Sequence, residues 1–269
     1  ECFKSIKPKD AKYLIISITP YTFLACLLLK LFGRTPIIFL RSDGFGEYKS
    51  IIGKLGTLIY FIMFNISSFT SNFISCRNYI LKGKKGRVIS PSQLDSTWLR
   101  KPKSIDIDRF KLLFVGRIKV EKGIFSLVNL IKNKPKISLT ILGAERQTHY
   151  KINQSNIKIH VTENNKMKLI KFYDDHNIFV LPSFTEGHPM VLLEALARRR
   201  PVIIFEEISH VIGNKKGIFV SKRNFSNFFE TLRLIKKNYK KIQKDMTKNK
   251  LPTNKQFIEE FIKAINSFK

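Results

Sequence analysis

The sequence predicts an α/β protein with two doubly wound domains, in which helices cover both faces of parallel sheets. Short, continuous apolar segments alternate with segments of helical period along most of the 269 residues, which is typical of this class. A polar, proline-bearing stretch over residues 90–109 separates two such series and predicts a domain boundary. Hydrophobic residues make up 43% of the chain and aromatic residues 12%, which excludes a disordered or fibrous protein.

The predicted strands are ten short apolar segments, many of them rich in β-branched residues. They cover residues 13–18, 36–40, 72–76, 87–90, 111–115, 137–142, 157–161, 178–181, 201–205 and 217–220. Pro20 interrupts the longest apolar run, residues 13–29, so we expect a strand followed by a helix there and no membrane span. Residues 51–70 contain Lys54, Asn65 and two serines, and this composition predicts poor spanning as well.

Helices are predicted where apolar residues recur at positions i, i+3, i+4 and i+7. Two such sets are Ile124, Leu127, Val128 and Ile131, and Phe225, Phe228, Phe229 and Leu232. Thr253 and Gln256 form a capping box that predicts the start of a last helix. Because its apolar stripe of Phe257, Phe261 and Ile265 must be buried, we expect this helix to dock on the rest of the protein.

The predicted domains are an incomplete one over residues 1–95 and a second over residues 96–250. The remaining residues, 251–269, are expected to form a helix that packs back toward the first domain. The chain begins with Glu1 and shows no charged-then-apolar export signal, so we expect a fragment whose own N-terminus is missing. Three cysteines lie far apart, in no disulfide or metal-ligand spacing, which suits a reducing cytosol.

The charge balance is strongly basic, with 49 Lys and Arg against 20 Asp and Glu and a net charge of +29. Such a balance favours anionic partners: nucleic acid, phosphorylated small molecules or acidic lipid head groups. The basic residues are spread over nearly every element, and codon bias in the genome is an equal explanation for them. No zinc-finger, helix-turn-helix or RNP pattern is present, so we expect no specific nucleic-acid partner.

The first motif with chemical content is Phe-Val-Gly-Arg-Ile-Lys-Val-Glu-Lys-Gly over residues 114–123, a buried strand that turns into a helix. Gly116 lets an anion approach the backbone closely. Arg117 offers a bidentate fork for phosphate oxygens, and Lys122 adds a point charge near the helix start, where amides and the helix dipole also favour anions. These residues predict a phosphate site at the carboxyl end of a strand; the alternative is an ordinary basic turn.

The second motif, residues 181–194, carries two carboxylates. A buried strand ends at Pro182, Glu186 lies at the tip of a loop, and Pro189 fits the first turn of a helix that contains Glu194. Eight helical positions span about 12 Å, which is too far for one metal ion but suits opposite ends of a sugar nucleotide, whose hydroxyls donate to carboxylates. A carboxylate inside an apolar helix needs a partner; the alternative is that Glu186 caps the helix and Glu194 is a surface residue.

Both motifs in this order, about 70 residues apart, resemble the family-4 retaining glycosyltransferases (glycosyl transferases group 1), which have the GT-B fold of two Rossmann-like domains. The family shows a Gly-Arg-x-x-x-x-Lys-Gly turn and then Pro-Ser-x-x-Glu-Gly-x-Pro leading to a Glu-x7-Glu pair. The matching positions are Gly116, Arg117, Lys122, Gly123, Pro182, Ser183, Glu186, Gly187, Pro189 and Glu194. The linker, with Pro91, Asp95 and Trp98, is similar too, and the likeness covers residues 87–220.

The resemblance implies a role for each matching residue. Arg117 and Lys122 would hold the donor diphosphate and stabilise charge on the departing nucleotide, while Glu186 would contact the transferred sugar. Gly187, His188 and Pro189 would lie along the sugar or phosphate, Gly116 would leave room for the diphosphate, and Glu194 would bind ribose. The family is usually independent of metal, so we expect no metal and no cofactor besides the nucleotide-diphosphate sugar as co-substrate.

Three features depart from the family. The helix after Glu194 ends in Arg198, Arg199 and Arg200 where the family has glycine, and a left-handed arginine costs about 1 kcal/mol more than glycine. Residues 206–210, Glu-Glu-Ile-Ser-His, replace a Gly-Gly turn, which leaves the far wall of the donor pocket undefined. His188 stands where the family has an aromatic or aliphatic residue.

The first hundred residues are expected to be the end of the acceptor-side domain. Arg41 or Asp43 would line the cleft where the family places a histidine, although a plain turn is an equal interpretation. Asp106 and Asp108 imitate a metal-binding Asp-x-Asp without its context. The Asp-Asp-His at residues 174–176 is better explained as the end of a helix than as a metal site.

The predicted function is therefore the retaining transfer of a hexose from a nucleotide-diphosphate sugar to an envelope glycan or lipid-linked acceptor. We expect a cytoplasmic protein that contacts the anionic inner face of the cell membrane peripherally. The alternatives are a GT-B epimerase or phosphorylase and, outside enzymes, a basic protein that binds nucleic acid or membranes.

Overall fold

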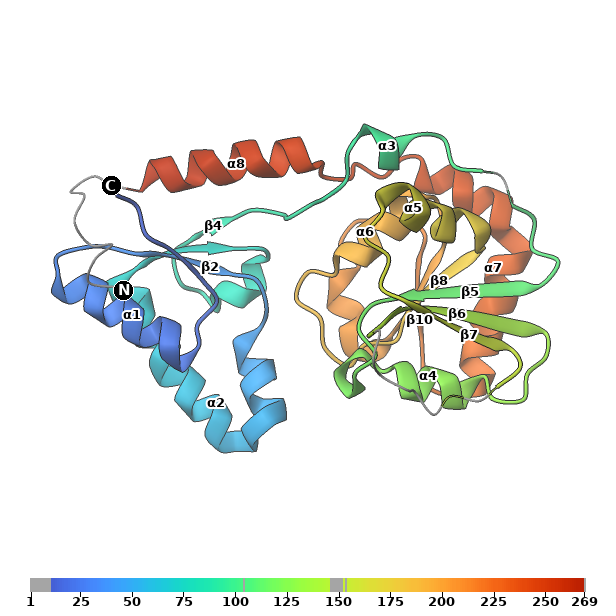
Figure 1. The fold of residues 1–269 in the computed structure, drawn as a ribbon, viewed down its shortest axis with the longest axis horizontal. Helices are drawn as coiled ribbons and strands as arrows, with labels where there is room; N and C mark the ends of the chain where they lie inside the picture. The colour runs from blue at the N-terminus through green and yellow to red at the C-terminus, as the bar shows by residue number, and fades with distance from the viewer. Residues whose placement is uncertain (1–10, 104, 146–151, 153, 269) are drawn as a thin grey trace. The chain divides into compact units, whose positions relative to one another are not determined.

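The computed structural model describes residues 11–103, 105–145, 152 and 154–268, which form two compact units (Figure 1). The first unit contains the described chain up to Ser92, the short segment Glu186–His188, and the chain from Pro252 onward. The second unit contains Gln93–Thr185 and Pro189–Leu251. The first unit therefore consists of three separate stretches of the chain.

The first unit is built on a four-stranded parallel sheet. Its strands, in order across the sheet, are β1 (Leu14–Ile16), β2 (Ile37–Leu40), β3 (Asn72–Ser75) and β4 (Arg87–Val88). The helical elements are α1 (Pro20–Leu31), α2 (Gly44–Thr70), η2 (Asn78–Leu81) and α8 (Asn254–Ser267). Right-handed crossovers between successive strands place α1 and α2 on one face, and α8 lies on the other (Figure 1).

Local signals in the sequence set the ends of these helices. Pro20 occupies the first turn of α1 and Thr19 caps it, so the apolar run splits into a strand and a helix as expected. The Thr253 side chain accepts from Gln256 N at 3.2 Å, which confirms the predicted capping box of α8. The Phe261 ring of α8 lies 5.1 Å from the Phe39 ring of β2, so the apolar stripe of the helix is part of the core.

The second unit is a six-stranded parallel sheet in the order β10-β9-β8-β5-β6-β7. The strands are β5 (Phe110–Val115), β6 (Ile137–Ala144), β7 (Ile157–Val161), β8 (Ile178–Leu181), β9 (Val202–Phe205) and β10 (Ile218–Ser221). The helical elements are α3 (Ser96–Leu99), η3 (Val120–Lys122), α4 (Ile124–Leu130), α5 (Lys166–Asp175), α6 (Met190–Ala197), η4 (Glu206–Val211) and α7 (Phe225–Met246). All predicted strands are present in the two sheets, which confirms the α/β fold class.

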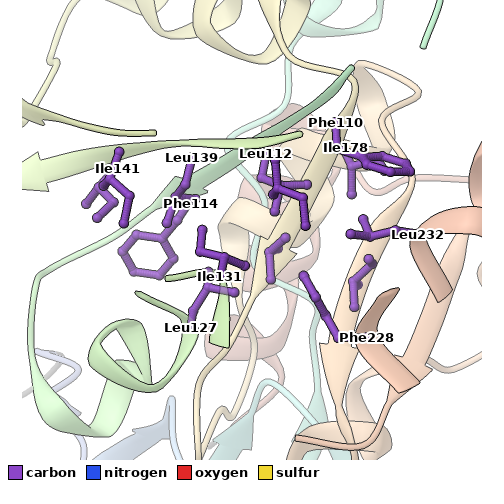
Figure 2. Close-up of a cluster of buried hydrophobic side chains, with 14 of the residues drawn as sticks. Phe110, Leu112, Phe114, Leu127, Ile131, Leu139, Ile141, Ile178, Phe228 and Leu232 are labelled. Carbon is purple, nitrogen blue, oxygen red and sulfur yellow. The ribbon is translucent and has the colours of Figure 1, made fainter. Parts of the chain in front are cut away.

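Helices cover both faces of this sheet. On one face Phe110, Leu112 and Phe114 of β5 pack with side chains of α4 and α7, among them Leu127 and Phe228 (Figure 2). On the other face side chains of α5 and α6 pack on Leu113, Phe179 and Ile204. Because alternate residues of each strand enter opposite cores, the strands are apolar throughout, which is why the sequence shows continuous apolar segments and no alternation.

Two of the three arginines after α6, Arg198 and Arg200, hold residues 98–103 in place. Arg199 has a φ of +50°, so the expected left-handed arginine is present. Arg198, 3% exposed, donates to both oxygens of Asp174 and to the carbonyls of Trp98 and Arg100. Arg200, 1% exposed, donates to the Tyr173 and Lys103 carbonyls. The arginine run therefore has a structural function, since it anchors residues 98–103.

Candidate functional site

The first motif forms a tight turn at the carboxyl end of β5. Gly116 has a φ of +153° and donates its amide to Leu142 O at 2.9 Å. Gly143, at the end of β6, has a φ of +136°, and a Cβ there would lie 2.2 Å from Gly116 O. The two backbones touch without side chains between them, so glycine is required at residue 143.

Contacts within the second unit join the two motifs directly. Gly123 has a φ of +65°, and a Cβ on it would lie 1.8 Å from the carbonyl oxygen of Pro182. Phe184 N donates to Glu121 O at 3.0 Å. Since β5 and β8 are neighbours in the sheet, the turn after one strand and the loop after the other meet at the same edge, where ligands of open α/β sheets bind.

The basic side chains of the first motif lie on this turn. Arg117 is exposed, and Lys122 is half-buried at the end of η3. The helix makes a smaller contribution than expected, because α4 begins only at Ile124 and has seven residues. An anion at this turn would therefore be attracted by the charges of Arg117 and Lys122 more than by a helix dipole.

The second motif begins at the end of β8, where Ser183 is fully buried. Pro189 is the N-cap of α6 and not a residue of its first turn as expected. Its carbonyl oxygen accepts a hydrogen bond from Leu192 N at 3.2 Å. A proline can occupy this position because the bond uses its carbonyl oxygen and not the backbone N–H that proline lacks. The start of α6 thus lies directly after the loop that carries Glu186.

Glu194 of α6 is 2% exposed, so the interpretation of it as a surface residue is wrong. Its Oε2 accepts from the Tyr173 hydroxyl at 2.7 Å, and its Oε1 accepts from the side-chain amide of Gln93. Burial raises the pKa of Glu194, while the hydrogen bonds from Tyr173 and Gln93 act in the opposite direction. Tyr173 is buried, whereas Gln93 is exposed, so one carboxylate oxygen is hydrogen-bonded from the core and the other by a side chain at the surface.

The tip of the loop, Glu186–His188, belongs to the first unit. Tyr79 donates its hydroxyl to Glu186 O at 3.3 Å, and His188 Nε2 lies 2.8 Å from Pro91 O. A Cβ on Gly187 would lie 2.9 Å from Arg41 O, so the close approach of the backbone requires glycine. One ring nitrogen of His188 thereby has a structural partner.

Arg223, which follows β10, contacts the loop of the second motif and was not among the residues that the sequence predicted. Its Nη1 donates to Pro182 O at 3.0 Å and its Nε to Glu207 Oε1 at 2.8 Å. The guanidinium carbon lies 4.2 Å from the Phe184 ring centroid and 4.2 Å from that of Phe205. The hydrogen bond from Arg223 lowers the pKa of Glu207. Its position directly after a strand was the one signal in the sequence.

Asp174, which was considered as a metal ligand, and Asp43, which was considered as a cleft residue, have structural partners. Asp174 pairs with Arg198 and Arg200, and α5 ends at Asp175 as predicted. Asp43 caps α2, accepting from Phe45 N at 3.2 Å, in accordance with the plain-turn interpretation. Within the described residues, no group of three or more His, Cys, Asp or Glu side chains could hold a metal ion.

Comparison with known structures supports the fold. The chain is similar to sucrose-phosphate synthase from Thermosynechococcus elongatus, with a TM-score of 0.70, 16% identity, and coverage of 97% of this chain and 75% of that one. HepE from Anabaena, solved with UDP, gives a TM-score of 0.75 at 12% identity over 99% and 82% of the two chains. A TarM variant from S. aureus gives a TM-score of 0.69 at 14% identity, with coverage of 99% of this chain and 58% of that one. No curated protein matches the sequence.

The family assignment rests on the region that carries both motifs. Residues 95–251 match the model of the family described as glycosyl transferases group 1. This region contains the turn after β5, the loop after β8 and the buried Glu194, and it is more than half of the chain. The chain belongs to the glycosyl transferases group 1 and is a glycosyltransferase with the GT-B fold.

Proposed function

We propose that this enzyme transfers a hexose from a nucleotide-diphosphate sugar with retention of the anomeric configuration. The observation that carries the proposal is the contact between the two motifs, Gly123 against Pro182 and Phe184 N to Glu121 O. It brings a doubly basic turn beside a loop that leads to two carboxylates. A diphosphate flanked by two sugars is complementary to this arrangement, because its anionic centre would meet the cations and its sugar hydroxyls would meet the carboxylates.

The diphosphate site consists of Arg117 and Lys122. The planar guanidinium of Arg117 can form two parallel hydrogen bonds to phosphate oxygens. Lys122, half-buried on the same turn, supplies a second charge. When the bond to the sugar breaks, negative charge grows on the leaving diphosphate, and fixed cations stabilise that charge more in the transition state than in the bound donor. Basic side chains alone supply this stabilisation, without a metal.

The ribose site is Glu194, and the structure supports a specific exchange there. Tyr173 holds one carboxylate oxygen from inside the core, and Gln93 donates to the other from the surface. A ribose hydroxyl is a donor of the same kind, so it would take the place of the Gln93 amide. Glu194 would then remain fully hydrogen-bonded in the free and the bound enzyme.

The remaining loop residues serve the transferred sugar. Glu186 accepts hydrogen bonds from sugar hydroxyls, and the backbone at Gly187 and His188 runs along the sugar or phosphate. The acceptor is an envelope glycan or a lipid-linked sugar at the cytoplasmic face of the membrane, which suits a protein with a net charge of +29.

A donor screen by thermal shift tests the proposal. A ligand at 100 times its dissociation constant stabilises a protein by about 2.7 kcal/mol, so the matching nucleoside diphosphate raises the melting temperature clearly. In Arg117→Ala we expect this shift to vanish, and in Lys119→Ala, an exposed cation on the same turn, to persist. An equal shift in both variants would place the diphosphate elsewhere.

A further inference from the structure

Helix α2 is apolar on two opposite faces, and only one of them is used by the fold. The buried face consists of Gly56, Tyr60, Met63, Phe64 and Ser67, at helical spacing. A second stripe at the same spacing is exposed after the break at Gly53: Leu55, Leu58, Ile62, Ile66 and Phe69. A soluble helix normally carries polar residues on its outer face, and a helix that is apolar all round needs a second apolar environment.

Helix α1 also carries exposed apolar side chains. Tyr21, Leu24 and Leu31 are exposed at helical spacing along that helix. The two helices pack together, since Cys26 Sγ of α1 lies 3.1 Å from the Ser71 hydroxyl at the end of α2. Both lie on the same face of the four-stranded sheet (Figure 1). We call this combined set, made of the five residues of the α2 stripe and these three of α1, the α1–α2 surface.

The geometry of α2 favours a helix that lies on a membrane over one that crosses it. Among the described residues, α2 is the one helix long and apolar enough to span a bilayer, and 28% of its most apolar window is buried. Its inner face packs on the sheet, with the Phe64 and Phe73 rings 5.4 Å apart. A break at Gly53, with a φ of +67°, divides it into two helical segments, residues 44–52 and 54–70. The longer segment packs on the sheet through its inner face, and its outer stripe is exposed.

The sequence around the α1–α2 surface is basic. No acidic residue occurs between Glu47 and Asp95, whereas seven basic residues do: Lys49, Lys54, Arg77, Lys82, Lys84, Lys85 and Arg87. Residues 11–42 contain no acidic residue either. Lys84 Nζ lies 5.0 Å from the ring centroid of Phe69, so a cation stands at the edge of the exposed stripe. An apolar stripe edged with cations matches the head-group boundary of an anionic bilayer.

We propose that the α1–α2 surface docks on an anionic lipid bilayer. The apolar side chains would enter about 5–10 Å into the boundary between head groups and acyl chains, while the lysines pair with anionic head groups. A second copy of the chain is the poorer occupant, because each copy carries a charge of +29 and the two would repel. The proposal does not depend on the donor site, so failure of one leaves the other standing.

Vesicle co-sedimentation with the full chain tests the proposal. The double variant Leu58→Ser/Ile62→Ser changes side chains that are 55% and 49% exposed, and its control, Ile258→Ser/Ile262→Ser on α8, changes ones that are 48% and 53% exposed. We expect the wild type and the control to bind phosphatidylglycerol-containing vesicles, less so at high salt, and pure phosphatidylcholine vesicles weakly. The α2 variant should bind the anionic vesicles at least about tenfold more weakly.

Two results would overturn the proposal. The first is equal binding of the two double variants to anionic vesicles, since the α1–α2 surface would then play no part. The second is a dimer in sedimentation velocity without lipid that the α2 variant, and not the control, converts to monomer. In that case the surface is an interface between two copies. Circular dichroism melting curves establish that both variants are folded before either measurement.

Discussion

Substituting Gly123 with alanine perturbs the contact that joins the two motifs. At a φ of +65° any side chain costs about 1 kcal/mol relative to glycine. The new Cβ would also lie 1.8 Å from Pro182 O, a backbone atom that cannot rotate away. Overpacking of a tight contact costs about 1–3 kcal/mol. The sum is a destabilisation of about 2–4 kcal/mol, with the loop after β8 pushed away from the turn after β5.

Gly213 provides the matched control for this substitution. It lies in the same unit with a φ of +54°, and the one heavy atom near a Cβ there is the flexible Lys215 Nζ at 3.7 Å. Gly213→Ala should therefore cost only the conformational term of about 1 kcal/mol. Denaturant titration measures both costs, and binding of the donor nucleotide should weaken in Gly123→Ala alone. Equal costs in the two variants would refute the direct contact between the motifs.

Two further predictions concern buried charges in the second unit. Because burial raises the pKa of Glu194 above 4.5, its charged form destabilises the fold at higher pH, so Glu194→Gln should be at least as stable as the wild type at pH 7. This advantage should shrink as the pH falls through the raised pKa toward 4.5 and be absent below it. Urea titrations at pH 7 and pH 4 test this, and a variant less stable than the wild type at pH 7 would contradict it. Asp174→Asn leaves the buried guanidinium groups of Arg198 and Arg200 without their carboxylate. We expect the free energy of unfolding to fall by about 3–5 kcal/mol. The control is Asp175→Asn, at an exposed neighbour, and an equal loss in both variants would show that the ion pairs contribute little stability.

Elements set by local sequence could be predicted. The strands follow from continuous apolar segments, and Pro20 and the Thr253 capping box act through neighbours within a few residues. The two glycines of the first motif are required by backbone conformations that few other residues adopt, so their pattern alone located the turn. Boundaries were less accurate, as at Pro189, because one residue separates a cap from a first turn.

Features made by distant residues could not be predicted. Glu194 and Gln93 are more than 100 residues apart in the sequence, and no local motif around either residue predicts their hydrogen bond. Arg198 and Arg200 looked like a departure from a family pattern, while in the folded chain they hold residues 98–103 in place. The outer stripe of α2 was equally hidden, since the sequence shows that a helix is apolar but not which of its faces the core covers.

The most direct test of the donor site is a cycle that removes the β-phosphate and the Arg117 side chain separately and together. Isothermal titration compares the nucleoside diphosphate with the monophosphate on the wild type and on Arg117→Ala. If Arg117 binds the diphosphate, the wild type prefers the diphosphate by about tenfold or more and the variant loses most of that preference. An unchanged preference in the variant would contradict the account.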